Sequence, residues 1–330
     1  MSGGQVRVAV IGMGEIGRGW AALCAANGWP VAIYDTEAQA LREAPDEIAT
    51  RARSLVALAQ ATAEEVDEGL ASVKVGRSLL QACSDADWII EAVREDLLTK
   101  QKTFEGIESV AGKARIVTSS SSSYAAKDIA GRCVRQDRCL VAHPLTPVEL
   151  VPVVELAPSP HTDKALVELL KAWLRALGRI PVTINKQVPG NVANRIAAAV
   201  WREAIDLVLN DVIGVEDLDR AVSLGPALGW AAAGPHLTYH LAAGQKGVDG
   251  FLQNLIHMFE NTWADLATWS HLEPEQRNKL IHSIERSYKD NLEKIRPLRD
   301  RRLAAILRGL EKTRRTVATR RQSLGEAAET

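Results

Sequence analysis

The chain has 330 residues, of which 46% are hydrophobic and 25% are charged, and its formal net charge is −1. This length allows two domains with sizeable cores. The near-zero charge argues against a global attraction to nucleic acid or to an anionic membrane. No apolar stretch is long enough to span a bilayer, and the first strand pattern begins too close to Met1 for a signal peptide. We therefore expect a cytoplasmic protein with no nucleic-acid or membrane partner.

Short β-branched runs alternate with helical patterns through the first half of the chain. Several runs are continuously apolar, which is typical of parallel strands buried on both faces. The alternation predicts an α/β fold with a doubly wound sheet of the Rossmann type. Residues 37–71 are charged and alanine-rich, which predicts one or two long helices inserted between strands. The expected strands are 6–12, 30–35, 72–75, 86–93, 114–119, 138–144, 151–157 and 179–185.

The character of the sequence changes after the turn signal Val188-Pro189-Gly190. No convincing strand follows, and helical periodicity dominates. We expect a dinucleotide-binding domain over residues 1–187 and an all-α domain for substrate binding and dimerisation over residues 188–330. The stretch IAAAVWREAIDLVLN is apolar on more than one helical face, so its second face needs a partner. A homodimer is the simplest arrangement.

The cysteines are scattered and form no C-x-x-C pair, so buried thiols in a reducing compartment are expected rather than disulfides. No group of side chains has the spacing of a metal site, and no metal is expected. The four cysteines are Cys24, Cys83, Cys133 and Cys139.

Gly12, Gly14 and Gly17 form a G-x-G-x-x-G motif directly after the first strand and before a helical pattern. In that context the glycines permit a tight turn, close approach of a pyrophosphate and close packing of the helix. The helix N-terminus adds unpaired N–H groups and a partial positive charge. The second strand ends in Asp35, where a carboxylate accepts hydrogen bonds from an adenosine ribose. A 2′-phosphate would meet a like charge there, so NAD is favoured over NADP; the alternative is a glycine turn without a ligand.

Polar residues at two predicted strand ends, in one apolar run and at one helix start could carry chemistry: Ser122, His143, Glu155 and Asn194. Each residue also has a purely structural explanation. Ser122 could lie in a flexible loop, and His143 could be a turn residue at the end of a strand. Glu155 could form a salt bridge with a buried arginine, and Asn194 could cap a helix. The combination favours function, because oxidation of an alcohol needs a base for the hydroxyl proton while NAD takes the hydride. A histidine titrates near neutrality, and a buried carboxylate orients its ring and stabilises the imidazolium.

The segments GMGEIG, IIEAVRED, TSSSSSY, HPLTPVELVPVVE and VPGNVANRI together resemble the 3-hydroxyacyl-CoA dehydrogenase superfamily. The resemblance implies that His143 and Glu155 form the catalytic pair and that Ser122 and Asn194 contact the substrate. It places the segment from Glu91 to Lys100 beside the cofactor. The expected cofactor contacts are Gly12, Met13, Gly14, Glu15, Ile16, Gly17, Asp35, Ala92, Val93, Glu95, Lys100 and Ser120.

The stretch GPALGWAAAGPHLTYHLAAGQKGVDGFLQ resembles the branch that contains L-carnitine dehydrogenase, L-gulonate 3-dehydrogenase and lambda-crystallin. The resemblance implies a small free 3-hydroxy acid as substrate. One departure is Gly229, where the branch commonly has an arginine before the aromatic residue; Arg195 and Lys246 are possible substitutes. The aromatic side chains of Trp201, Trp230 and Tyr239 could line a pocket for a quaternary ammonium or a flat aromatic substrate, or belong to the core and to a dimer contact. The expected substrate contacts are Ser122, Asn194, Trp230 and Tyr239.

The sequence thus predicts an NAD-dependent dehydrogenase that oxidises the secondary alcohol of a small, carnitine-like or related 3-hydroxy acid to the 3-oxo acid. Two alternatives stay open. One is a 3-hydroxyacyl-CoA dehydrogenase, in which the inserted helices help to hold the thioester. The other is a catalytically silent NAD-binding protein of the crystallin type.

Overall fold

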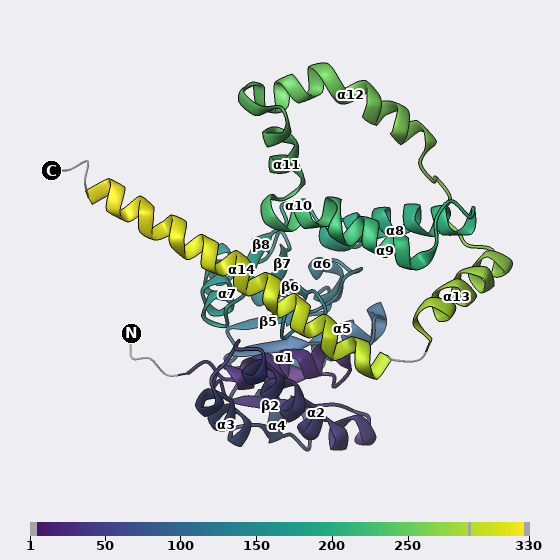
Figure 1. Cartoon of the computed structure of the whole chain (residues 1–330). Coiled ribbons are helices and arrows are strands. Elements are labelled where there is room, and N and C mark those ends of the chain that lie inside the picture. The colour runs from purple at the N-terminus through teal and green to yellow at the C-terminus, as the bar shows by residue number, and fades with distance from the viewer. Residues whose placement is uncertain (1–4, 290–291, 327–330) are drawn as a thin grey trace. The chain divides into compact units, whose positions relative to one another are not determined.

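The computed structural model describes residues 5–289 and 292–326 (Figure 1). The chain divides into two compact units, Met1–Arg195 and Ile196–Thr330. In the described part of the chain, no helix combines the length and the apolar character that crossing a membrane requires. All four cysteines are buried and unpaired, as expected.

The first unit is built on a sheet of eight strands in the order β3-β2-β1-β4-β5-β6-β7-β8. The order of the first six strands is that of dinucleotide-binding sheets, so the predicted doubly wound α/β fold is confirmed. In such sheets ligands bind beyond the carboxyl ends of the strands, where the order reverses, here between β1 and β4. The strands are β1 (Val8–Ile11), β2 (Val31–Tyr34), β3 (Lys74–Val75), β4 (Trp88–Glu91), β5 (Ile116–Ser119), β6 (Cys139–Pro144), β7 (Val153–Pro158) and β8 (Ile180–Thr183).

The pair β6–β7 is antiparallel, whereas every other neighbouring pair is parallel. The expectation of parallel strands is therefore wrong at this pair. Residues 145–152 connect the two strands without a helix, and a parallel connection needs a longer crossover. The antiparallel register sets His143 directly opposite Glu155.

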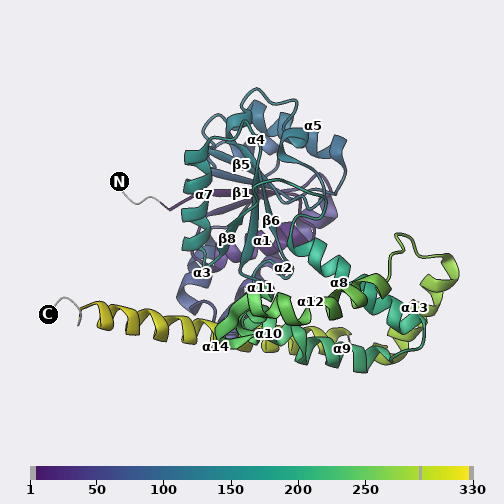
Figure 2. The same cartoon turned by 90° about the horizontal axis from the view of Figure 1, so that it is seen from above.

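Helices cover both faces of this sheet. On one face Trp20 of α1 contacts Trp88 of β4 edge-on and Trp173 of α7 contacts it at a tilt, with ring centroids 5.6 Å and 6.3 Å from that of Trp88. Helices α7 and α5 lie on opposite sides of the sheet (Figures 1 and 2). The prediction of inserted helices over residues 37–71 is confirmed by α2 and α3. The helices are α1 (Glu15–Ala26), α2 (Ala38–Ala57), α3 (Ala63–Ala71), α4 (Leu79–Cys83), α5 (Leu97–Val110), α6 (Ala126–Ile129), the 3₁₀ turn η1 (Gln136–Arg138) and α7 (Lys164–Ala176).

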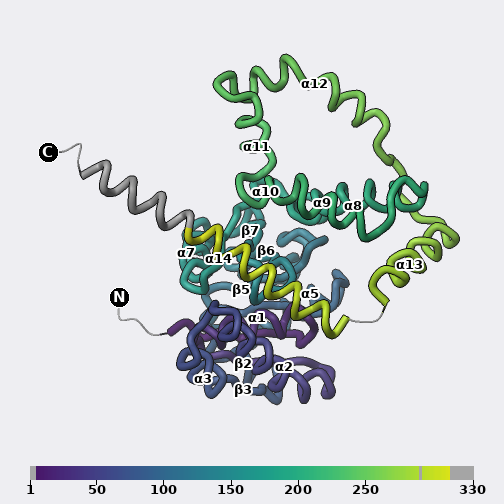
Figure 3. Tube along the Cα trace, in the orientation of Figure 1, coloured from purple at the N-terminus to yellow at the C-terminus, as the bar shows by residue number. Residues whose placement is uncertain are grey.

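The second unit is helical, and no strand follows β8 in the described residues. Helix α8 begins at Ala193 in the first unit and continues in the second. Helix α11 lies between α10 and α12 along the chain (Figure 3). The ring of Tyr239 contacts Phe251 and Phe259, with centroids 5.2 Å and 5.4 Å away. The helices are α8 (Ala193–Leu209), α9 (Val215–Leu224), α10 (Pro226–Ala233), α11 (Pro235–Ala242), the 3₁₀ turn η2 (Gly244–Lys246), α12 (Gly247–Asp265), α13 (Pro274–Tyr288) and α14 (Leu292–Glu326).

Candidate active site

Glycine is required for different reasons at the three positions of the motif after β1. Gly12 has a φ of +100°, and a Cβ there would lie 2.6 Å from the backbone of Ala92. A Cβ at Gly17 would lie 1.8 Å from the carbonyl oxygen of Gly12. A Cβ at Gly14, in contrast, would have no atom within 4 Å. Packing within the chain explains Gly12 and Gly17, whereas the open space at Gly14 fits a ligand that approaches the backbone at the N-terminus of α1.

The carboxylate of Asp35, at the end of β2, is fixed beside this turn. Its Oδ2 accepts a hydrogen bond from the Met13 backbone N–H at 2.6 Å, and its Oδ1 accepts one from Glu37 N–H at 2.8 Å. Each carboxylate oxygen has a further lone pair, and the side chain is partly exposed. Asp35 can therefore accept hydrogen bonds from a ribose held at the glycine turn.

The first turn of α1 and the residues after β4 and β5 complete this edge of the sheet. Glu15 forms an ion pair with Arg51 of α2 at 2.5 Å, and Ile16 is partly exposed. Ala92 donates its N–H to Ile11 at 2.7 Å, which continues the β1–β4 ladder. The Ser120 hydroxyl accepts a hydrogen bond from Trp20 Nε1 at 3.1 Å.

Lys100 and Glu95 belong to an ionic cluster in which Lys100 and Glu91 are buried and Glu95 is exposed. The Lys100 ammonium lies 2.9 Å from Glu91 Oε1, 3.1 Å from Glu95 Oε2 and 3.2 Å from the Val93 carbonyl oxygen. The contacts with Glu91 and with the Val93 carbonyl are hydrogen bonds, and the contact with Glu95 is an ion pair. Lys100 is only 1% exposed.

His143 and Glu155 form a buried hydrogen-bonded pair. His143 Nδ1 lies 2.9 Å from Glu155 Oε2, and the two residues are 6% and 2% exposed. The other oxygen of Glu155 accepts hydrogen bonds from the backbone N–H groups of Val192 and Ala193, at 3.0 Å and 2.9 Å. These donors lie at the start of α8, where N–H groups lack partners within the helix. The carboxylate is thus held on one side by the ring and on the other by a helix N-terminus.

The segment around residue 190 links the pair to the loop after β5. Gly190 donates its N–H to the carbonyl oxygen of Ser122 at 3.1 Å. Asn194 lies in the first turn of α8, one residue after an N–H donor to Glu155. The structure therefore brings the backbones at Ser122 and Asn194 together with the His143–Glu155 pair.

Sequence reasoning missed Asn191 in the same segment. It is fully buried, its φ is +51°, and neither atom of its carboxamide has a hydrogen-bond partner among the described residues. Buried polar groups are normally paired, so this carboxamide is an unusual feature beside Glu155. The P-G-N sequence was a usable signal, because asparagine tolerates the left-handed conformation better than most residues.

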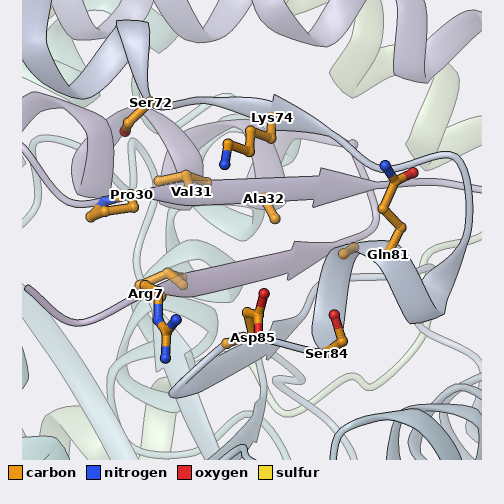
Figure 4. Close-up of a pocket in the computed structure, with 12 residues that line it drawn as sticks. Arg7, Pro30, Val31, Ala32, Ser72, Lys74, Gln81, Ser84 and Asp85 are labelled. Atoms are coloured by element: carbon orange, nitrogen blue, oxygen red, sulfur yellow. The ribbon is translucent and has the colours of Figure 1, made fainter.

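Two further features are a pocket in the first unit and the aromatic residues expected to contact the substrate. A pocket of about 400 Å³ is lined by Arg7, Lys74 and Asp85, among others, at the amino ends of β1 and β2 (Figure 4). Gly12 and Asp35 follow the carboxyl ends of the same strands, so this pocket is not the candidate dinucleotide site. The expected aromatic contacts Trp230 and Tyr239 belong to α10 and α11 of the second unit, and both are partly buried.

The family models and the individual relatives that match the chain point to the same family. Residues 7–188 match the NAD-binding domain of 3-hydroxyacyl-CoA dehydrogenase, and residues 190–279 match the C-terminal domain of that family. The chain is 32% identical over 320 residues to L-carnitine dehydrogenase of Nocardiopsis dassonvillei, covering 95% of this chain and 94% of the relative. It is 32% identical over 277 residues to the human lambda-crystallin homolog, covering 82% of this chain and 86% of the relative.

Two further matches complete the comparison. The chain is 30% identical over 308 residues to an L-carnitine dehydrogenase/betainyl-CoA thioesterase of Ruegeria pomeroyi, covering 92% of this chain but only 62% of that longer relative. The structure of 5-formyl-3-hydroxy-2-methylpyridine 4-carboxylic acid 5-dehydrogenase, described as an NAD⁺-dependent dismutase, matches with a TM-score of 0.77 and 28% identity, covering 93% of this chain and 99% of that one. With its NAD-binding domain and helical second domain, the chain belongs to the 3-hydroxyacyl-CoA dehydrogenase family of NAD-dependent oxidoreductases.

Proposed function

We propose that the chain oxidises the secondary alcohol of a small 3-hydroxy acid to the 3-oxo acid, with His143 as general base. The contact between His143 Nδ1 and Glu155 Oε2, at 2.9 Å, carries this proposal. With Nδ1 bonded to the carboxylate, the ring presents Nε2 as the proton acceptor for a substrate hydroxyl. Glu155 then stabilises the imidazolium that forms. NAD, when bound, supplies the hydride acceptor.

The surroundings of Glu155 support its role. Its second oxygen is held by the N–H groups of Val192 and Ala193, so the carboxylate cannot turn away from the ring without losing both bonds. Its 2% exposure keeps water from screening the interaction with the imidazolium. We assign the Ser122 hydroxyl and the Asn194 carboxamide to the substrate oxygen, which they orient by hydrogen bonding.

We also propose which residues contact NAD, starting from the glycine turn and Asp35. Gly14 offers unobstructed backbone to a pyrophosphate, and Asp35 offers carboxylate lone pairs to the ribose. Around them we place Gly12, Met13, Glu15, Ile16, Gly17, Ala92, Val93, Glu95, Lys100 and Ser120.

The names of similar proteins, rather than the shape of a pocket, indicate which class of substrate to expect. Names of the relatives point to carnitine in one case and to a pyridine carboxylic acid in another, and both compounds are small acids. Gly229 offers no cation for a substrate carboxylate, so we propose Arg195 or Lys246 for that role. Trp230 and Tyr239 are proposed as aromatic contacts of the substrate.

A 3-hydroxyacyl-CoA substrate is the second candidate, because the family models are those of 3-hydroxyacyl-CoA dehydrogenases. An NADH-formation screen separates the two. It should cover carnitine, gulonate, 3-hydroxybutyrate and hydroxylated aromatic acids, and it should include acetoacetyl-CoA in the reverse direction. Turnover of a free acid with none of the thioester supports our proposal. Turnover of the thioester alone refutes it, and NAD binding without any turnover would favour a crystallin-like role.

We also propose that two copies of the chain pair through the second unit. Leu224, Leu241 and Leu292, on α9, α11 and α14, are 72%, 62% and 74% exposed. A second chain that covered these side chains would remove their apolar area from water, which favours association. Light scattering coupled to size-exclusion chromatography should give twice the mass of one chain, and a monomer at micromolar concentration would contradict the proposal.

A further inference from the structure

Asn191 follows a turn that is anchored to the loop after β5. Gly190 donates its N–H to the carbonyl oxygen of Ser122 at 3.1 Å, and Asn191 donates its own to the carbonyl oxygen of Val188 at 2.9 Å. Gly190 has a φ of +77°, which glycine adopts at no steric cost. The direction of the chain is therefore already fixed by the neighbouring loop where it reaches Asn191.

The two residues after Asn191 are anchored to the proposed catalytic pair. Val192 and Ala193 both donate their N–H groups to Glu155 Oε1, at 3.0 Å and 2.9 Å. Glu155 Oε2 lies 2.9 Å from His143 Nδ1. Successive backbone N–H groups converge on one anion where the chain turns, as in the backbone concavities that bind anions. The direction in which the chain leaves Asn191 therefore decides whether both bonds to the carboxylate form.

Asn191 joins these two anchored segments through a left-handed backbone. Its φ is +51°, a conformation that costs energy for residues with a Cβ and that asparagine tolerates better than most. Such strain persists where the surroundings fix the chain on both sides. Asn191 is 0% exposed, and neither atom of its carboxamide has a hydrogen-bond partner among the described residues. The segment therefore depends on the backbone conformation of this residue rather than on a side-chain bond.

The location of Asn191 is unusual for a left-handed residue. In the part of the chain that the structure describes, the other non-glycine residues with positive φ are Ala59 and Asp211, at 55° and 58°. They follow the ends of α2 and α8, and left-handed residues are common after helices. Asn191 instead precedes α8, so the ending of a helix does not account for its conformation. The two bonds to Glu155 provide a reason.

We propose that Asn191 is a positioning residue: its left-handed backbone turns the two N–H groups that follow it toward Glu155, and so holds the carboxylate against His143. This inference rests on the proposed function of the His143–Glu155 pair. Because Gly190 is bonded to Ser122, the same turn keeps the loop of Ser122 beside the pair.

The first test compares Asn191→Gly with Asn191→Ala. Both variants lack the carboxamide, but glycine adopts the left-handed conformation without strain and alanine does not. With the best acid from the screen, Asn191→Gly should keep kcat within about twofold of the wild type, whereas Asn191→Ala should lower it about tenfold at little-changed KM. A packing role predicts the opposite order, because glycine leaves the larger cavity. A kcat of Asn191→Gly as low as that of Asn191→Ala would overturn the proposal, and a comparable loss in Asn191→Gly alone would do so if Asn191→Ala does not fold.

Asp211→Gly and Asp211→Ala are the matched controls. Asp211 has a φ of 58° and lies just beyond the other end of α8, so the two variants alter the same backbone preference away from Glu155. The exposed Asp211 side chain pairs with Lys279 at 2.8 Å, and exposed ion pairs contribute little to stability. Both controls should keep the kcat of the wild type. A loss in Asp211→Ala equal to that in Asn191→Ala would overturn the specific role of Asn191.

A second measurement needs no substrate. In protein with isotope-labelled histidine, the Nδ1–H proton of His143 should give a low-field NMR signal, because it is bonded to Glu155; its absence in His143→Gln assigns it. The signal should keep its position in Asn191→Gly and move in Asn191→Ala, where the carboxylate loses its backbone donors. An unchanged signal in Asn191→Ala would refute the inference. A displaced signal with the kcat of the wild type would support the placement of Glu155 by Asn191 and refute the proposed role of His143 as base.

Discussion

Replacing Glu155 by glutamine tests the proposed base with little change in shape. Glutamine has one acceptor oxygen and one NH₂ donor group. The N–H groups of Val192 and Ala193 both point at one carboxylate oxygen, at 3.0 Å and 2.9 Å, so the amide oxygen must take that place. The NH₂ group then faces His143 Nδ1, which has to act as acceptor. The ring is forced into the tautomer with its proton on Nε2, where the substrate hydroxyl needs a lone pair.

The expected loss follows from the role of a general base. Positioned acid–base catalysis contributes about 10²- to 10⁴-fold in rate. At about 1.4 kcal/mol for each factor of ten, the barrier should rise by roughly 3–6 kcal/mol. NADH formation with the best acid from the screen measures kcat, calorimetry measures NAD affinity, and thermal unfolding measures Tm. NAD affinity should be retained, since Glu155 lies outside the glycine turn.

The control is Glu149→Gln, which alters another buried carboxylate, 8% exposed, on the connection between β6 and β7. It pairs with Arg51 at 3.6 Å rather than with a histidine. If Glu155→Gln keeps the kcat of the wild type, or if both variants lose activity equally, the assignment of His143 and Glu155 as the reacting pair is wrong.

Gly14→Ala should weaken NAD binding with little change in Tm, because the added Cβ meets no atom of the chain. Gly17→Ala should lower Tm, because its Cβ would lie 1.8 Å from a carbonyl oxygen. Equal Tm values for the two variants would refute this reasoning. Cys24 and Cys83 should resist alkylation in the native protein at neutral pH and react on unfolding, since burial raises the pKa of each thiol to about 12; fast native labelling counts against their burial. Because the folded pKa of Glu95 is below its ordinary value of 4.5, its stabilising contribution is present above that value and is lost as the pH falls through the folded pKa. The Tm difference between wild type and Glu95→Gln should therefore shrink on acidification, and a constant difference would contradict the reasoning.

Much of the site could be predicted because its residues follow strands. A strand that ends in glycines and a second that ends in an acid define Gly12, Gly14, Gly17 and Asp35 without knowledge of the packing, since parallel strands present their carboxyl ends at one edge. His143 at another strand end followed the same logic. Local chain chemistry alone sufficed for these positions.

The partners of Glu155 could not be predicted from the local pattern. Its contact with His143 depends on an antiparallel register that the apolar runs of β6 and β7 do not specify, and its second contact comes from the start of a distant helix. Lys100 is a similar case, because a lysine in a helix is normally exposed. Its burial follows from the close approach of Glu91 and Glu95, which only the packing of α5 against the sheet brings about.

The sequence by itself determined the α/β class, the dinucleotide turn and the family resemblance, because each depends on short-range patterns of glycine, charge and hydrophobicity. Only the tertiary structure decided which lone pairs and N–H groups are already used. Hydrogen bonding depends on distances between atoms far apart in the chain, and those distances make Glu155 a fixed partner of His143 and place the Lys100 ammonium between Glu91 and Glu95.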